Sequence, residues 1–143
     1  MPLIQVTALE GTLSKENQDA FMRRISNAVL KAERAPVNDS GAQSLVWAYY
    51  DEKPQGTVYV GGENLDKPPV RIAVTTPQGA LNFATRKSLV AELGQIVDEF
   101  IGSYDNRLNH WAMLYEVNEG SWAGGGGIFP LAGIQAAMNI QPE

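Results

Sequence analysis

Cysteine is absent from the 143-residue chain, and histidine occurs once, at position 110. Without cysteine the protein has no disulfide, no thiolate metal site and no cysteine nucleophile. A single histidine leaves no histidine cluster, so we expect neither a metal nor a cofactor. The 16 Asp and Glu residues outnumber the 11 Lys and Arg residues, and basic residues never form a run longer than a pair. Because this charge balance repels phosphate backbones, nucleic acid is not an expected partner.

Long apolar runs are also missing. No stretch approaches the roughly 18–20 apolar residues of a membrane span. The opening residues, MPLIQVTALEG, lack the basic start and the apolar core of a signal peptide. We therefore expect no membrane contact and a cytoplasmic location. With 44% hydrophobic and 19% charged residues, the chain has the composition of one folded domain over residues 1–143.

Hydrophobic periodicity predicts two consecutive strand–helix–strand units. The first unit, residues 2–63, combines strands at 3–9, 44–50 and 56–60 with a helix at about 15–33. The second unit, residues 69–127, combines strands at 70–75 and 110–116 with a helix that follows Asn82 and ends near 101. Residues 128–143 are a C-terminal segment with a short helix expected at 128–138.

The two units show an internal repeat. Trp47-Ala48 returns as Trp111-Ala112, and at the same offset of 64 residues EKPQGTVYVGG (52–62) returns as EVNEGSWAGGG (116–126). The offset increases to 67–68 over the first strand and helix. Two such units predict an α/β (α+β) domain with a four-stranded mixed sheet and both main helices on one face. The other face then needs a cover, for which we expect oligomerisation.

Familiar catalytic arrangements are not found. A Ser–His–Asp triad would have to use His110, and the glycine run 124–127 lacks the Lys-Ser/Thr of a phosphate-binding loop. Pro2 is chemically unusual, because removal of Met1 would expose a secondary amine. Burial disfavours the charged form of such an amine and brings it toward the neutral form that a general base needs. Our hypothesis is that the active chain begins at Pro2.

Three segments resemble the tautomerase superfamily: PLIQVTALEGTLS before an amphipathic helix, the pair AP before a polar loop, and the closing GTVYVGG. The first unit resembles a 4-oxalocrotonate tautomerase subunit. The double-length chain resembles the cis-3-chloroacrylic acid dehalogenase, malonate semialdehyde decarboxylase and macrophage migration inhibitory factor branches, over about residues 2–130. The resemblance implies a homotrimer whose sheets form a central barrel. It also implies Pro2 as the base of a cofactor-independent enzyme, in a pocket shared between subunits.

Other functional residues of the superfamily are replaced. The arginines of the tautomerases fall on Thr12 and Trp47, and those of the dehalogenases fall near Pro77 and Ala80. We therefore expect the activity that needs the fewest helpers, keto–enol proton transfer on a small 2-keto or dienol carboxylic acid. Two alternatives stay open: decarboxylation of a short 3-oxo acid by Pro2 with Asp39, and a trimer with no enzymatic activity.

The candidates for binding the acid are cations, apolar walls and a backbone turn. An arginine would bind the carboxylate, tryptophans would keep the amine neutral, and the turn at Gln78 would donate backbone N–H groups to an oxyanion. These candidate substrate-binding residues are Arg71, Arg34, Trp111, Trp122 and Gln78.

Overall fold

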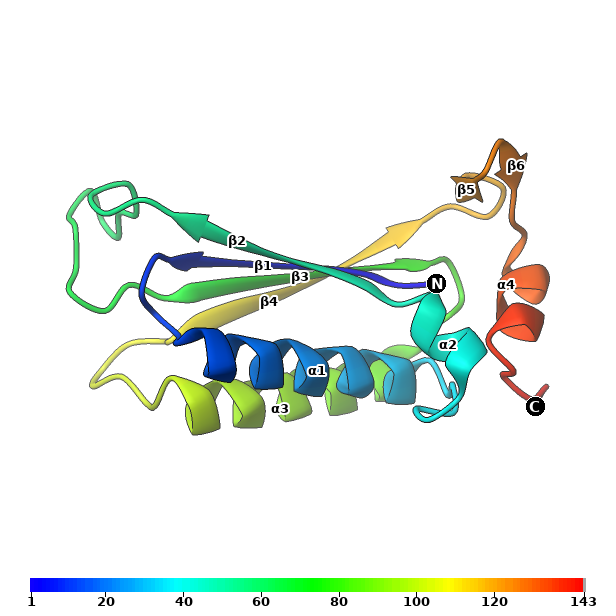
Figure 1. Ribbon diagram of the computed structural model, residues 1–143, viewed down its shortest axis with the longest axis horizontal. Coiled ribbons are helices and arrows are strands. Elements are labelled where there is room, and N and C mark those ends of the chain that lie inside the picture. The colour runs from blue at the N-terminus through cyan, green and yellow to red at the C-terminus, as the bar shows by residue number, and fades with distance from the viewer. Residues whose placement is uncertain (143) are drawn as a thin grey trace.

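A computed structural model describes residues 1–142 as a sheet with two long helices packed beneath it (Figure 1). The elements in chain order are β1 (Leu3–Leu9), α1 (Lys15–Ala32), α2 (Ser40–Ser44), β2 (Trp47–Lys53), β3 (Val70–Pro77), α3 (Phe83–Phe100), β4 (His110–Val117), β5 (Ala123–Gly124), β6 (Gly127–Ile128) and α4 (Leu131–Ala137). Within the described residues, no helix is both long and apolar enough to cross a membrane.

The four long strands form one mixed sheet in the order β2-β1-β3-β4. Each unit contributes a parallel pair, β1 with β2 and β3 with β4, and the two pairs meet through antiparallel β1 and β3. The register aligns Leu3 with Trp47 in the first unit and Arg71 with Trp111 in the second. The repeat is therefore structural, with an offset of 68 residues for the first strands and 64 for the second. Because β1 and β3 are antiparallel, the two units begin at opposite ends of the sheet.

Both long helices cover the same face of the sheet, as the repeat predicted (Figure 1). Alternate residues of β1 point into this layer, so Ile4, Val6 and Ala8 are buried against the helices. The helices begin at side-chain caps: Ser14 accepts the Asn17 N–H for α1, and Asn82 forms a reciprocal capping box for α3. Capped ends and an apolar stripe fix where each helix starts and which side it buries.

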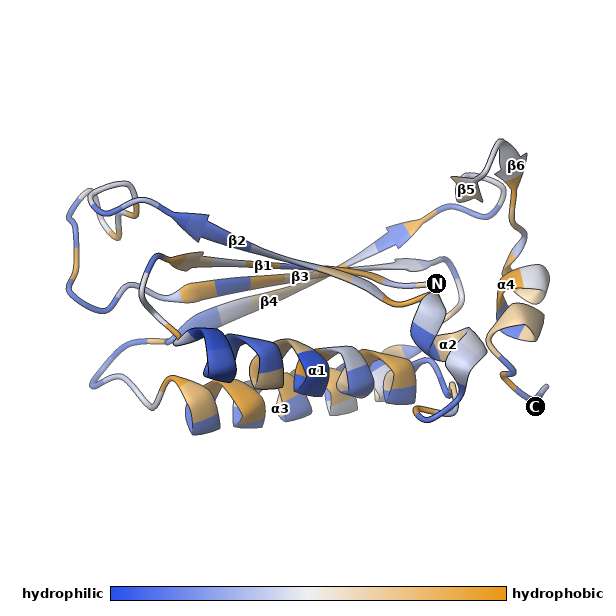
Figure 2. Cartoon of the chain, viewed as in Figure 1, coloured by the Kyte–Doolittle hydropathy of each residue, from blue (hydrophilic) through white to orange (hydrophobic). Residues whose placement is uncertain are grey.

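The opposite face of the sheet carries large aromatic side chains that none of residues 1–142 covers. Trp47 is 61% exposed and Trp111 is 66% exposed, and Tyr49 and Tyr115 lie near them on the same edge strands. Figure 2 shows hydrophilic residues where β2 ends, at Asp51–Lys53. Charges at a strand edge discourage further strand pairing, whereas exposed aromatic side chains are typical of a surface that contacts another molecule.

Several predicted boundaries are wrong. The strand expected at 44–50 is β2 at Trp47–Lys53, because Asp39 caps the short helix α2 just before it. Residues 56–60 form no strand: a turn follows Pro54, Gly56 has φ 81°, and one isolated bridge joins Val60 to Glu63. The C-terminal helix is shorter than predicted, since Pro130 precedes α4 and the preceding residues form the β5–β6 hairpin.

Candidate functional site

Pro2 is buried immediately before β1, at the end of the sheet where the first unit begins. Its carbonyl oxygen accepts a hydrogen bond from the Trp47 N–H at 3.2 Å, which ties the chain start to the first residue of β2. A cavity of about 230 Å³ lies against it, here called the Pro2 cavity. Its lining is almost wholly apolar: Met1, Pro2, Leu3, Leu45, Trp47, Trp122, Ala123 and Gly124.

Trp122 reaches this cavity because the β5–β6 hairpin holds its backbone. The Trp122 carbonyl accepts the Phe129 N–H at 2.9 Å, and β5 pairs with β6 across a tight turn. Gly125 and Gly126 form that turn with φ of 57° and 86°, a conformation that favours glycine. The glycine run is therefore a hairpin turn that positions an indole.

The terminal nitrogen of Met1 lies next to two groups from distant parts of the chain. It is 3.5 Å from Glu33 Oε1 and 2.7 Å from the sulfur of Met138. Burial lowers the pKa of this amine, and the nearby Glu33 carboxylate opposes that shift. While Met1 is attached, the Pro2 nitrogen is an amide whose lone pair is delocalised, so it is no base.

The predicted substrate-binding residues do not gather around Pro2 within one chain. Only Trp122 shares the cavity with it. Gln78 lies at the same end of the sheet, but it does not line the cavity. Its backbone N–H, the expected oxyanion donor, donates to the Val117 carbonyl at 2.8 Å, and its side-chain oxygen accepts the Glu119 N–H at 3.0 Å. Arg34 is exposed on a different surface, beside Asp39 and the C-terminal residues.

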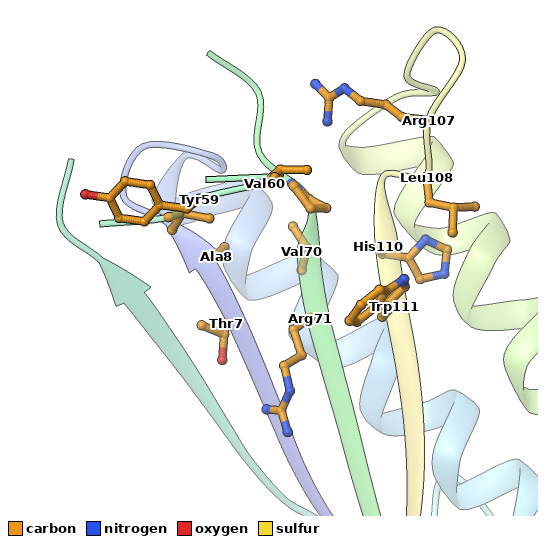
Figure 3. Close-up of a pocket in the computed structure, with 13 residues that line it drawn as sticks. Thr7, Ala8, Tyr59, Val60, Val70, Arg71, Arg107, Leu108, His110 and Trp111 are labelled. Carbon is orange, nitrogen blue, oxygen red and sulfur yellow. The ribbon is translucent and has the colours of Figure 1, made fainter. Parts of the chain in front are cut away.

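Arg71 and Trp111 line a second cavity of about 480 Å³, the Trp111 cavity, at the opposite end of the sheet (Figure 3). It is the repeat counterpart of the Pro2 cavity, with Val58 in place of Trp122 and Val70 in place of Pro2. The arginines do not converge: Arg71 and Arg107 point in different directions. Arg107 is also engaged elsewhere, stacked on the Tyr104 ring at 4.3 Å.

His110 also lines the Trp111 cavity. Its Nδ1 is 2.7 Å from the side-chain oxygen of Asn109, and Asn109 in turn donates to Asp98 and to the Gly102 carbonyl. Burial lowers the pKa of His110, against the opposing effect of Asp98. This network holds the loop between α3 and β4, and within residues 1–142 no three acidic or histidine side chains gather as a metal site would need.

Glu33 is the feature that sequence reasoning missed. It is 2% exposed, although it directly follows α1 and the predicted helix simply ends there. The signal was in the helical spacing, since Ile25, Val29 and Glu33 follow one another at intervals of four and the first two are core residues. A carboxylate that continues an apolar stripe is therefore a candidate for a buried charged group.

No family model and no curated protein matches the sequence. Solved structures do match the fold. A native fused 4-OT has a TM-score of 0.72 at 16% identity, covering 88% of this chain and 94% of that one. A protein inactivated by 2-oxo-3-pentynoate has a TM-score of 0.72 at 24% identity, with the same coverages. The macrophage migration inhibitory factor of Toxoplasma gondii has a TM-score of 0.67 at 20% identity, covering 89% and 99%. The chain has the fold of the tautomerase superfamily, as the resemblance implied.

Proposed function

We propose that the protein is a tautomerase that moves a proton between carbon and oxygen of a small 2-keto or dienol carboxylic acid, with Pro2 as the general base. The observation that carries the proposal is the position of Pro2, buried at the start of β1 against a small apolar cavity. The proposal requires loss of Met1, which converts the Pro2 amide into a secondary amine. The likeness to fused 4-OT structures supports the fold on which this chemistry depends.

The chemistry follows from the cavity walls. Leu45, Trp47 and Trp122 give the cavity apolar walls, and an apolar environment favours the neutral form of an amine. The neutral Pro2 nitrogen takes a proton from one position of the substrate, the electron pair left behind moves through the conjugated system, and the resulting ammonium returns the proton at the other position. Atoms and charge balance without a cofactor.

Assembly is part of the proposal. The open sheet face carries exposed Trp47 and Trp111, and fused 4-OT structures of similar fold are trimers, symmetric in one case and asymmetric in another. In a ring of three chains, each contact joins two different surfaces. Such a contact can bring Arg71, exposed at the far end of the sheet, to the Pro2 cavity of a neighbouring chain, where it would bind the substrate carboxylate.

Decarboxylation with Asp39 has less support. The Asp39 carboxylate accepts the Ala42 N–H at 2.9 Å as the cap of α2, and it accepts the Asn139 amide at 2.9 Å. Asp39 does not line the Pro2 cavity. Its hydrogen bonds join α2 to the end of α4, which is a structural role.

Three forms of the chain test the proposal: one that begins at Pro2, one that keeps Met1, and Pro2→Ala produced without Met1. The substrate is the enol of phenylpyruvate, and the rate of ketonisation is measured after intact mass spectrometry has verified each N-terminus. The Met1 form lacks a basic nitrogen at residue 2, so kcat/KM should fall by roughly 10²–10⁴-fold. Pro2→Ala keeps a primary amine and should fall between the other two.

Equal activity in the Pro2 form and the Met1 form would show that Pro2 is not the base. Absence of activity in all three forms, with each one folded, would instead favour a trimer that is not an enzyme. Labelling by 2-oxo-3-pentynoate adds a second readout, because only a free amine adds to its conjugated triple bond. The adduct should appear on Pro2 in the form that begins there.

A further inference from the structure

The carboxyl group of Glu33 lies in an unusual place for a charge. Its side chain is 1% exposed at the end of α1, and Oε1 accepts no hydrogen bond from the described residues. Burying a carboxylate without hydrogen bonds is costly unless a positive charge compensates for it. The terminal amine, 3.5 Å away, is the charge that faces it.

The second unit supplies an internal comparison. At the offset of 68 residues, Glu33 corresponds to Ile101, which also directly follows its helix and packs against the core. The helix end of this unit therefore accepts an apolar side chain. In the first unit the terminal nitrogen of Met1 faces this position, whereas Val70, the counterpart of Pro2, continues from a loop. The carboxylate occurs in the unit that holds the amine.

Other charged groups near the chain start are directed elsewhere. The elements that meet there, β1, α2 and α4, carry no ionisable side chain. On α1, Lys31 is exposed and pairs with Glu92 at 3.7 Å. Arg34 is exposed, and Asp39 is held by its hydrogen bonds to Ala42 and Asn139. Glu33 and the amine thus face each other inside an apolar surround.

We propose that Glu33 is the charge partner of the N-terminal amine: its buried carboxylate faces the amine at the start of β1 and stabilises the protonated form. This inference rests on the proposed function, because the amine of interest is that of Pro2 after Met1 is lost. Glu33 is a positioning residue, since it acts on the base and not on the substrate.

Loss of Met1 keeps the pair within electrostatic range. Successive backbone nitrogens are less than about 3.8 Å apart, so the Pro2 nitrogen lies no more than about 7 Å from Glu33 Oε1 before any adjustment. Removal of Met1 also opens space into which either group can move. In an apolar surround, an opposite charge at such a distance still stabilises the protonated amine.

The two groups shift in opposite senses. Burial lowers the pKa of the Met1 amine and raises the pKa of Glu33, while each group opposes the other's shift. The two pKa values therefore approach each other, as expected for two groups that titrate as a coupled pair. Without the carboxylate, the effect of burial on the amine is unopposed. The pKa of the N-terminal amine should therefore be lower in Glu33 variants than in the unmodified chain.

The experiment uses chains that begin at Pro2 and carry ¹⁵N-proline, and it follows the Pro2 nitrogen signal by NMR as pH is varied. The variants are Glu33→Gln, Glu33→Ile, which copies Ile101, and the matched control Glu16→Gln on the exposed first turn of α1. Both Glu33 variants should titrate about half a pH unit or more below the unmodified chain, and the control should match it. The acid limb of kcat/KM should move to lower pH by the same amount.

Titration midpoints of both Glu33 variants within about 0.2 pH unit of the control would overturn the pairing. Glu33→Asp, which keeps the charge, covers the case in which a neutral variant fails to fold: it should titrate nearer to the unmodified chain than any neutral variant does. The NMR readout needs no turnover. An inactive protein with a shifted Pro2 titration would therefore contradict the proposed function alone, and an active protein with no shift would contradict the pairing alone.

Discussion

The two β-α-β units of this chain build the same backbone at opposite ends of one sheet, yet the cavities at those ends differ in chemistry. The likeness extends to single hydrogen bonds: Glu10 accepts the Gln55 N–H, and Gln78, its counterpart, accepts the Glu119 N–H, both at 3.0 Å. The Pro2 cavity has Trp122 where the Trp111 cavity has Val58, and beside it the terminal amine of Met1 faces the buried Glu33 carboxylate. The Trp111 cavity is larger and has arginines whose side chains diverge. The repeat thus accounts for the shared backbone, and differences at a few positions account for the different side chains at the two ends.

The largest effect should come from the aromatic face that both units share. Trp47→Glu and Trp111→Glu place a charge at repeat-related positions of the open face, where burial against another chain would leave it unpaired. Each should convert the proposed trimer to monomer at micromolar concentration in sedimentation equilibrium, with the Lys15→Glu chain as an exposed control. If the unmodified chain is itself a stable monomer, the trimer proposal and the shared site are wrong.

The next effect concerns the common core. Ile25 on α1 and Leu93 on α3 are repeat counterparts, and both are fully buried in one cluster beneath the sheet. Truncating either to Ala should lower the free energy of unfolding by about 2–5 kcal/mol, since each deletion leaves a cavity in the same core. Denaturant unfolding measures both. If one substitution lowers the free energy of unfolding as expected and the other lowers it by less than about 1 kcal/mol, the two units do not fold as one cooperative domain.

The smallest effect separates the two cavities. Trp122→Ala removes a wall of the Pro2 cavity, admits water to the base, and should lower kcat/KM by about tenfold. Val58→Ala is the repeat counterpart in the Trp111 cavity and should change kcat/KM by less than about twofold. Steady-state kinetics on the same substrate compare them. Equal losses would show that both cavities contact the substrate.

Much of the fold could be predicted because it rests on local periodicity. The helices begin at Ser14 and Asn82 as predicted, and the repeat of Trp47 as Trp111 indicated the duplicated unit. Segments whose structure depends on distant contacts were less predictable. Residues 56–60 were predicted as a strand but have no partner strand, and the short strands of the β5–β6 hairpin were not predicted.

The sequence by itself determined the two amphipathic helices, the apolar strands and the placement of Pro2 at the start of the first strand, because spacing and capping are encoded within a few residues. Only the tertiary structure decided which side chains meet. It brought Trp122 to Pro2 and separated Arg71 and Trp111 from it, because antiparallel β1 and β3 put the two unit starts at opposite ends of the sheet. It also placed Glu33 beside the chain start, since residues 32 positions apart become neighbours only when α1 packs beneath β1.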